Sequence, residues 1–455
     1  MGSVLSKNGR DFWNISKTSL YDYLKTRGDS LLQLKLDLNN DNDGVSATSL
    51  MHDHVIPGFA RVDGYNKLVK RLKDEFNLTV GSINDEKPAN FFEFPYDWRR
   101  DNRQTASKLK ALIDRALATW REDRELPDAK VILIAHSMGG LVSRYYLEVL
   151  GGWQNCRALI TFGTPFRGSV DILEGLHSGV HKAMSDLTDV VRGLPSAYQL
   201  LPIFEMVRHE DRFRRVAELE WGGKLDPHLT SDALQFHREI EAKVDENRQR
   251  AEYQNQGYKV IPFVGIGQPT KLSADYQKDT LKISNERPHW IDDESLSDGD
   301  GTVPRLSAIP IEYSNELRET YLIERHGSLQ NNDQLLADVV ERIRRMQSDK
   351  LKAIRGEIGL NAKNGISLEL PPLFVNEPVC FTATVAGVAH VPKALTVRVS
   401  NAVTNEVVVE DAHMVRSGDK FELRDLILGQ GRFRLLIEAD ALDDIPSICE
   451  LTEVV

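Results

Sequence analysis

The chain has 455 residues, more than one ordinary domain holds, so two or three domains are expected. With 41% hydrophobic and 27% charged residues it can bury a sizeable core, which excludes a disordered, collagen-like or disulfide-stapled protein. The net charge of -11 disfavours nucleic acid and strongly anionic membranes as electrostatic partners.

The cysteine content indicates a reducing compartment. Cys156, Cys380 and Cys449 are an odd number in a large chain, and none is needed as half of a bridge. Residues 1–11 lack the apolar stretch of a secretion signal, and no apolar run approaches the roughly 18 residues of a membrane span. We therefore predict a cytoplasmic protein.

Short β-branched runs alternate with helical stretches from about residue 55 to residue 346. This rhythm is typical of the α/β class, in which crossover helices cover a mainly parallel sheet. Apolar runs predict strands over residues 91–94, 131–135, 157–162, 260–265 and 320–323. Helices are predicted over residues 104–120, 138–149 and 332–346.

Strand-like runs stop between about residues 168 and 256, where charged helical sequence such as residues 210–215 and 239–250 takes over. We interpret this segment as a helical cap inserted into the α/β domain. The alternative is a solvated helical elaboration with no role in substrate choice, because charge runs usually mark exposed faces.

The pattern of residues along the chain changes again after residue 352. Strand-like runs recur over residues 379–385, 395–399 and 433–437 with turns between them, and helical patterns vanish. Residues 365–455 are therefore predicted to form a small, immunoglobulin-like β-sandwich. The segment contains no His, Cys and carboxylate cluster at metal-ligand spacing, so we expect it to bind or dock a protein partner.

A nucleophile is predicted in the string Ala135-His136-Ser137-Met138-Gly139-Gly140, which ends an apolar strand and opens an amphipathic helix. A nucleophilic serine must be exposed on a tight strand-to-helix turn, with small residues two positions before and after it. Ala135 and Gly139 meet that requirement, although alanine replaces the usual first glycine. A serine that merely caps a turn would explain Ser137 but not the surrounding string.

Serine becomes a good nucleophile only beside a base, which in this type of fold is a histidine supported by an acid further along the chain. His326 follows an apolar strand and precedes the last helix of the α/β region. Asp300 lies in a turn-rich acidic loop before it. The order Ser137, Asp300, His326 is that of a hydrolase triad.

The acid has alternatives in the same region. Asp298 is two residues from Asp300 and cannot be separated from it by chemistry alone, and Asp292 is a weaker candidate. The loop could also bind calcium, although it offers few oxygen ligands at alternating positions. The other histidines, including His136 beside the nucleophile, are expected to have surface or packing roles.

These strings, in this order, resemble the lecithin:cholesterol acyltransferase family, which includes acyltransferases and phospholipases acting on lipid esters. The resemblance spans most of residues 1–347 and leaves the all-β tail outside it. It is carried by Val55-Ile56-Pro57-Gly58-Phe59, Tyr96-Asp97-Trp98-Arg99, the Ser137 string, Thr164-Pro165-Phe166-Arg167-Gly168-Ser169, Gly299-Asp300-Gly301-Thr302-Val303 and His326.

The start of the chain departs from the family pattern. In the family, an apolar strand and a Pro-Gly turn precede a Met-Gly-Ser-like string, and that turn supplies one N–H of the oxyanion hole. The residue after the nucleophile, here Met138, supplies the other. The first strand and its donor are expected just before Met1, or Gly58 or Phe59 donates instead.

The resemblance implies an α/β-hydrolase domain over residues 1–350. We expect a serine-dependent lipid O-acyltransferase, esterase or phospholipase that forms an acyl-enzyme in lipid metabolism, with peripheral membrane contact and without cofactor or metal ion. Two rivals stay open: a catalytically silent binding module, and a hydrolase of non-lipid esters, thioesters or peptides.

Overall fold

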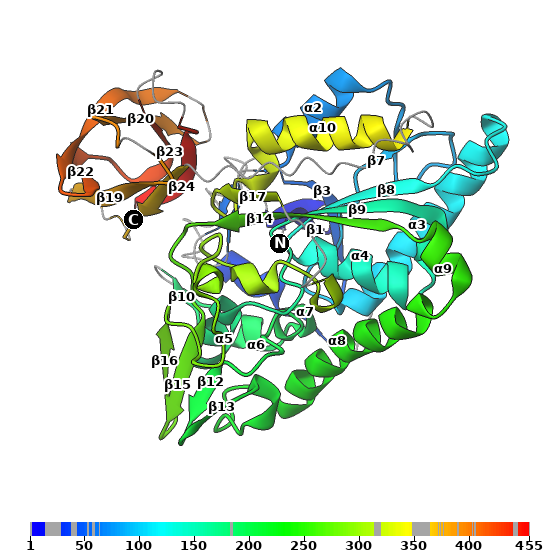
Figure 1. Ribbon diagram of the computed structural model, residues 1–455, viewed down its shortest axis with the longest axis horizontal. Helices are drawn as coiled ribbons and strands as arrows, with labels where there is room; N and C mark the ends of the chain where they lie inside the picture. Colours follow the sequence, from blue (N-terminus) through cyan, green and yellow to red (C-terminus); the bar gives the residue numbers. More distant parts are fainter. Residues whose placement is uncertain are drawn as a thin grey trace.

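The computed structural model describes most of the chain. The described residues are 2–13, 29–37, 43–51, 54–56, 60–62, 64–182, 185–313, 320–347, 365–371, 373, 375, 377–388, 391–402, 404, 406–439 and 445–454. They form an α/β domain and a separate C-terminal β domain (Figure 1).

A four-stranded parallel sheet is the centre of the α/β domain. Its strands are apolar runs, as expected where both faces are covered. The order is β17 (Thr320–Ile323), β14 (Lys259–Ile266), β9 (Cys156–Phe162) and β8 (Val131–His136). The predicted strands over residues 131–135, 157–162, 260–265 and 320–323 are confirmed. The fifth is shorter than predicted, because β7 (Phe91–Phe92) pairs only over two residues with β6 (Val80–Gly81).

Helices cover both faces of this sheet (Figure 1). One face packs against α2 (Asn66–Glu75) and α10 (Asp333–Gln347). The other packs against α3 (Asn102–Asp123), α4 (Met138–Glu148) and α8 (Pro227–Arg248), with the short α9 (Ala251–Gln256) at the end of α8. The three predicted helices and the α/β class are thus confirmed.

The N-terminal segment forms small antiparallel sheets beside the main one. β1 (Ser3–Lys7) lies between β2 (Arg10–Trp13) and β3 (Val45–Leu50), and β4 (His54–Ile56) pairs with β5 (Ala60–Val62). Within the described residues β8 pairs with β9 alone, and the expected strand before Met1 stays a prediction.

The segment 168–256 is not wholly helical as predicted. It contains α5 (Val170–Ser178), α6 (Thr188–Arg192), α7 (Pro195–Tyr198) and α8, but also the short strands β10 (His181–Lys182) and β11 (Ser185–Asp186).

The charged residues 210–215, predicted to be helical, instead belong to a hairpin of β12 (Val207–His209) and β13 (Arg212–Arg214), which joins β15 (Ser273–Gln277) and β16 (Thr280–Ser284) in one sheet. Glu210 turns the chain with a φ of 55°, and buried Val207 alternates with exposed Arg208. Because so many of these residues are charged, the alternation of buried and exposed side chains that marks a strand could not be recognised in the sequence.

Short 3-10 helices connect the larger elements. They are η1 (Asp29–Leu34), η2 (Gly152–Asn155), η3 (Val216–Glu218), η4 (Glu294–Leu296), η5 (Arg305–Ser307), η6 (Ile311–Tyr313) and η7 (Leu329–Asn331).

The C-terminal domain is all β, as predicted, with a core of its own. Its seven strands form one sheet in the order β18 (Gly365–Glu369), β19 (Pro378–Ala386), β22 (Lys420–Ile427), β21 (Val407–Ser417), β20 (Leu395–Asn401), β23 (Gly431–Ala439) and β24 (Ile448–Val454). The expected two-sheet sandwich takes the form of a single, nearly closed sheet, because the long strand β21 pairs with β20 over residues 407–414 and with β22 over residues 415–417.

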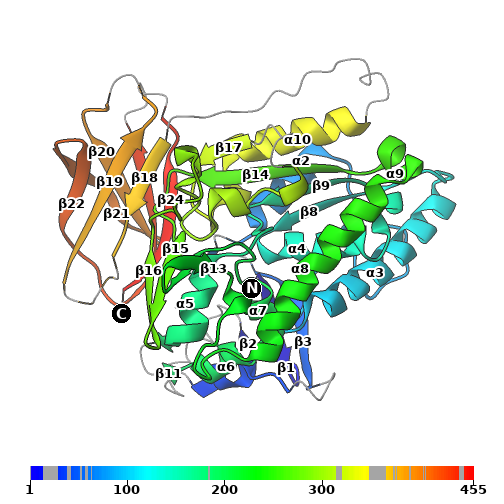
Figure 2. The same ribbon diagram turned by 60° about the horizontal axis from the view of Figure 1, so that its bottom comes forward.

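The two domains are in contact (Figure 2). The end strands of the C-terminal sheet, β18 and β24, lie against the α/β domain, where a Cβ on Gly365 would be 2.6 Å from the Cβ of Ile323. Packing this close leaves no room for a larger side chain at residue 365.

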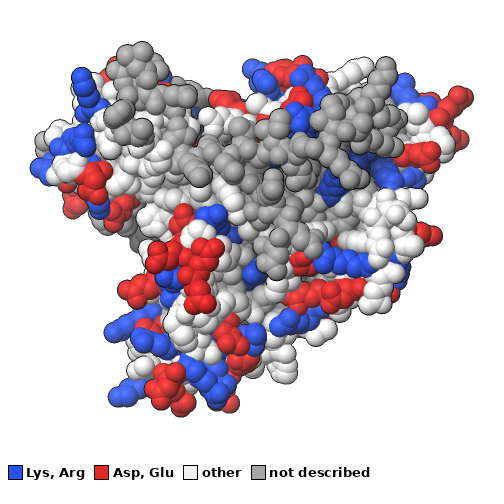
Figure 3. All heavy atoms as spheres, in the orientation of Figure 1, with Lys and Arg blue, Asp and Glu red and all other residues white. Residues whose placement is uncertain are grey.

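Acidic and basic side chains are intermixed on the face shown in Figure 3, over the sheet of β12, β13, β15 and β16 and along α8. On this face the net negative charge is therefore not gathered into one acidic patch. Among the described helices, none has both the length and the apolar sequence needed to cross a bilayer.

A buried histidine on α8 predicts acid sensitivity. His237 is 3% exposed, its Nε2 bonds the Gln199 carbonyl at 2.9 Å, and burial lowers its pKa to about 4. The unfolded chain, with a histidine pKa near 6.5, binds more protons between these values, so stability falls as the pH falls below about 6.5. This residue should account for a loss on the order of 2 kcal/mol between pH 7 and pH 5.

Urea unfolding at both pH values tests this. His237→Gln should show a smaller loss between pH 7 and pH 5 than the unmodified protein, whereas His228→Gln, at an exposed site on the same helix, should not. Equal losses in all three proteins would contradict the assignment.

Candidate active site

Ser137 lies on the tight turn between β8 and α4. Its φ of 53° and ψ of −128° are strained for a residue with a side chain. Its N–H donates to the Phe162 carbonyl at 2.9 Å, and its own carbonyl accepts from Gly140 N–H at 3.0 Å. These bonds to the neighbouring strand and the first helical turn hold the strained conformation.

The glycine that matters most for packing at this turn is Gly140. A Cβ at Gly139 would lie 3.7 Å from that of Ala135, an ordinary contact, whereas a Cβ at Gly140 would lie 2.1 Å from Oγ1 of Thr164. The same Thr164 hydroxyl donates to the Ser137 carbonyl at 3.0 Å. Thr164, the first residue of the Thr-Pro string, therefore supports the turn that carries the serine.

The structure brings together the three side chains predicted as a triad. His326 Nε2 lies 3.0 Å from Ser137 Oγ, and His326 Nδ1 lies 2.7 Å from Asp300 Oδ2. A neutral His326 protonated on Nδ1 donates to Asp300 and can accept the serine proton at Nε2. Such an arrangement can activate Ser137 as a nucleophile.

Asp300 is 1% exposed and fully engaged. Its Oδ1 accepts from the N–H groups of Thr302 at 3.0 Å and Val303 at 2.7 Å, and its carbonyl accepts from His326 N–H at 2.9 Å. Hydrogen bonds at one carboxylate oxygen fix the direction in which the other faces the imidazole.

The alternative acids lie elsewhere. Asp298 directs Oδ2 to Gly267 N–H at 2.6 Å, and burial raises the pKa of its carboxyl group. Asp292 is exposed. Asp298 Oδ2 and both oxygens of Asp300 bond to protein groups, and within the described part of the chain no group of three or more His, Cys, Asp or Glu side chains is placed to hold a metal ion.

His136 packs, one of the two roles predicted for it, with its ring centre 4.9 Å from that of His326. The sequence did not predict its hydrogen bonds: Nε2 lies 2.9 Å from the His326 carbonyl and Nδ1 lies 3.2 Å from the Tyr65 hydroxyl. Burial and the nearby His326 hold the pKa of His136 well below its ordinary value, so the ring is neutral. A neutral ring donates from Nε2 to the carbonyl, which supports the His326 backbone.

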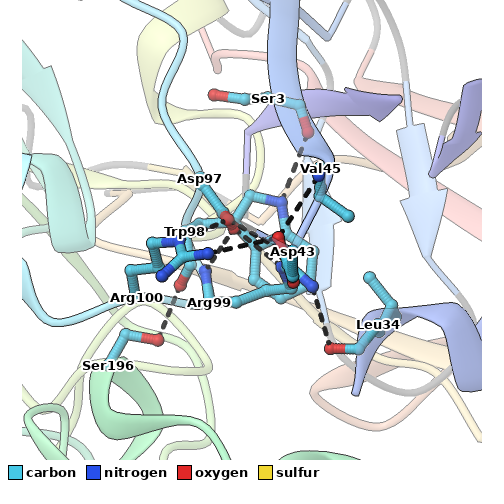
Figure 4. Close-up of polar contacts among 9 residues, drawn as sticks. All are labelled: Ser3, Leu34, Asp43, Val45, Asp97, Trp98, Arg99, Arg100 and Ser196. Atoms are coloured by element: carbon cyan, nitrogen blue, oxygen red, sulfur yellow. Dashed lines mark hydrogen bonds and ion pairs between the residues drawn. The ribbon is translucent and has the colours of Figure 1, made fainter. Parts of the chain in front are cut away.

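The Tyr-Asp-Trp-Arg string forms a buried ion cluster (Figure 4). Arg99, 0% exposed, binds Asp97 at 2.7 Å and Asp43 at 2.9 Å, and Arg100 binds Asp43 at 3.1 Å. Although burial alone would raise it, the Arg99 and Arg100 charges and the Val45 N–H hold the pKa of Asp43 below its usual value. Asp43 was missed because nothing in the sequence pairs it with a string more than 50 residues away.

This cluster connects the start of the chain to the site. Tyr96 N–H donates to Ser3 Oγ at 3.0 Å. Trp98 Nε1 donates to the Ser3 carbonyl at 3.3 Å, and Ser196 Oγ donates to the Trp98 carbonyl at 2.6 Å (Figure 4). Residues 3, 96–100 and 196 are thereby fixed to one another.

A cavity of about 690 Å³ opens onto Ser137 and His326. Met138, the predicted oxyanion donor, lines it beside Ser137, as do Gly2 and Ser3; Gly58 and Phe59 lie outside the described residues. The remaining lining is largely apolar and includes Ile172, Val180, Val191, Leu194, Ala197 and Leu200 from the segment 168–256, and Leu68, Leu72, Leu109, Ile113 and Leu133 from the layers around the sheet.

Gly163 allows the acid and histidine to meet. It has a φ of 53°, and a Cβ there would lie 2.7 Å from Asp300 Oδ2 and 2.9 Å from His326 Nδ1. Gly151 has a similar φ of 73° but no neighbour within 4 Å of a Cβ. Backbone strain should cost either alanine variant roughly 1–2 kcal/mol, and the collision should cost Gly163→Ala about 1–3 kcal/mol more.

Urea unfolding of both variants measures the difference. Equal losses of unfolding free energy for Gly163→Ala and Gly151→Ala would contradict the close approach of Gly163 to Asp300 and His326.

Comparison with known proteins agrees with the resemblance found in the sequence. Residues 56–208 match the model of the lecithin:cholesterol acyltransferase family, which confirms the resemblance over that part of the chain. No curated protein sequence matches significantly.

Two solved structures of a Bacillus licheniformis lipase, BlEst2, show distant likeness. The mature form has a TM-score of 0.27 and 16% identity, over 54% of this chain and 74% of that one. The propeptide form has a TM-score of 0.29 and 12% identity, over 77% of this chain and 83% of that one.

Proposed function

We propose that the chain, which matches the lecithin:cholesterol acyltransferase family over residues 56–208, is a serine-dependent enzyme that transfers acyl groups from lipid esters. The observation that carries the proposal is the continuous contact from Ser137 to His326 to Asp300, with distances of 3.0 and 2.7 Å. Three residues remote in sequence have no structural need to meet in this order at a strained turn.

In the proposed first step His326 Nε2 takes the Ser137 proton as Oγ attacks the ester carbonyl, and Asp300 stabilises the imidazolium. The Met138 N–H at the start of α4 is suited to stabilise the oxyanion, because helix N-termini present free N–H groups to negative charge. His326 then returns the proton to the leaving alcohol. Water entering the acyl-enzyme completes hydrolysis, and an alcohol entering completes transfer.

The apolar cavity supports an acyl chain as the group that is transferred. Pockets of this size with few polar groups bind apolar ligands by removing surface from water. Ser137 and His326 line it together with other polar side chains such as Glu93, Lys130 and Asp171, and most of the remaining wall is made of aliphatic and aromatic side chains.

We further propose that residues 168–256 act as a cap. The segments α5 to α7 contribute to the wall of the cavity, and Ser169 Oγ donates to the Thr302 carbonyl in the loop of Asp300. Much of the charged sequence that argued for a merely solvated elaboration lies on β12, β13 and α8, whereas the part that lines the cavity is mostly apolar, with Asp171 as its charged member.

Labelling with a fluorophosphonate tests the nucleophile and the acid. Ser137→Ala should abolish labelling. Asp300→Asn should reduce its rate about 10⁴-fold, because the amide favours the wrong imidazole tautomer. Asp298→Asn is the matched control and should change the rate by less than about tenfold, since it keeps an oxygen acceptor for Gly267.

Two outcomes would contradict these assignments. Absence of labelling in a folded, unmodified protein would favour the silent binding module. A larger effect of Asp298→Asn than of Asp300→Asn would transfer the role of acid to Asp298.

The cavity predicts a preference for longer acyl chains. Because each buried methylene contributes about 0.8 kcal/mol, kcat/KM for p-nitrophenyl esters should rise up to about fourfold per added methylene from acetate to octanoate. Ile172→Asn, in the cavity wall, should flatten the rise, whereas Ile311→Asn, at a site 49% exposed, should not. A flat or falling series in the unmodified protein would favour a non-lipid ester.

A further inference from the structure

The C-terminal sheet is open along one seam, between its end strands β18 and β24. Only the bridge between Leu373 and Val454 joins the two sides among the described residues. End strands carry backbone N–H and C=O groups without a strand partner, which proteins cover or pair. Here polar groups of Gln268 and of the loop that carries His326 bond to these strands, while β18 also packs on β17 and β24 packs on β4 and β5.

The loop of His326 is bonded to both sides of the seam. Arg325, the residue before His326, donates through Nη1 to the Leu368 carbonyl of β18 at 2.8 Å and pairs through Nε with Glu450 of β24 at 2.5 Å. Ser328, two residues after His326, donates through Oγ to the Cys449 carbonyl at 3.0 Å. The histidine is thus flanked by anchors on each side.

The loop of Asp300 is bonded to the seam through Gln268, which is 1% exposed. Its side-chain amide bonds β18 in both directions: Nε2 donates to the Ile366 carbonyl and Oε1 accepts from Leu368 N–H, each at 3.3 Å. Its backbone N–H donates to the Gly299 carbonyl at 3.0 Å, next to Asp300. One glutamine therefore replaces a strand partner for β18 and holds the acid loop.

The ion pair at the seam has little freedom. The Glu450 side chain is 3% exposed and that of Arg325 is 21% exposed. A buried carboxylate needs its cation, because an unpaired charge away from water is strongly unfavourable. The pair therefore fixes Arg325, and with it the backbone that leads into His326.

From these contacts we infer that the C-terminal β domain positions the triad: β18 and β24 hold the acid and histidine loops through Gln268, Arg325 and Ser328, which are positioning residues. The inference rests on the proposed function for its catalytic meaning. A shift of the histidine by about 1 Å can cost about 10²-fold in rate. Contacts that hold the backbone on both sides of His326 therefore protect the rate.

The decisive variant is Glu450→Gln, which keeps the shape of the side chain and removes its charge. The matched control is Glu453→Gln, on the same strand, whose partner Arg432 at 3.5 Å lies within the C-terminal domain. Glu450→Gln should slow fluorophosphonate labelling and lower kcat for an ester by about tenfold or more, with KM changed less than about twofold, because ground-state binding does not use the anchors. Glu453→Gln should change neither.

Hydrogen–deuterium exchange provides a readout that does not depend on activity. Peptides covering residues 299–303 and 320–331 should exchange faster in Glu450→Gln than in Glu453→Gln, and peptides of β8 should not change. Ser328→Ala removes one anchor and leaves the ion pair of Arg325 and Glu450 intact. It should show the same pattern more weakly, and it replaces Glu450→Gln as the test variant if Glu450→Gln fails to fold.

The outcomes are separable. Exchange and labelling in Glu450→Gln and Ser328→Ala equal to those in Glu453→Gln would overturn the positioning role and leave the proposed function intact. If the unmodified protein fails to label, the proposed function is wrong, and the exchange rates still decide whether the seam orders the two loops.

Discussion

The parallel pairing of β8, β9, β14 and β17 is the constraint on which the site depends. Parallel strands place their carboxyl ends at one edge of a sheet, so the segments after His136, Ile266 and Ile323 emerge side by side. Ser137 and His326 closely follow the first and the last of these strands. Asp300 comes after β15 and β16, and a bridge to Gln268 holds it beside the end of β14. The apolar sequences of the strands, covered by helices on both faces, keep that edge fixed.

Buried charges connect parts of the chain that hydrophobic packing alone would leave free to slide. The Arg99 cluster fixes the segment before β3 to the loop after β7, and the pair of Arg325 and Glu450 fixes the C-terminal domain to the histidine loop. Inside the α/β domain, Arg144 on α4 pairs with Glu312 of η6 as well as with Glu148 of its own helix. Because a buried ion pair loses hydration, it contributes little net stability, but a misplaced partner is costly. Such pairs therefore select one arrangement over others.

At the end of the cavity that holds the triad, the backbone of Ser137 is strained, two glycines approach neighbouring side chains closely, and much of the surrounding wall is apolar. Ser137 is held at a positive φ, and Gly140 and Gly163 let the backbone approach Thr164 and the acid–histidine pair where any side chain would collide. The proposed chemistry needs these features, since a triad acts only when its distances are short and water has limited access. Hydrolysis and transfer would use the same groups, and they differ in which acceptor reaches the acyl-enzyme.

The sequence by itself determined the local elements and the identity of the candidate triad. Period and composition located β8, β9, β14, β17 and their helices, because long apolar runs and amphipathic stretches are local signals. The triad candidates could be named because a predicted strand precedes Ser137 and His326, and Asp300 lies in an acidic turn between them in the order of a hydrolase triad. The charged hairpin at residues 207–214 was not found, since its alternation is short and its charge density is high.

Only the tertiary structure decided which acid meets His326, what His136 does, and what the β domain contacts. Asp298 and Asp300 differ in sequence position by two residues, yet only Asp300 faces the imidazole, since its other oxygen is fixed by two backbone N–H groups. The bonds of Asp43 to Arg99 and of Glu450 to Arg325 join residues more than 50 and more than 120 positions apart. Contacts over such separations leave no periodic trace, because they depend on how whole elements pack rather than on neighbours along the chain.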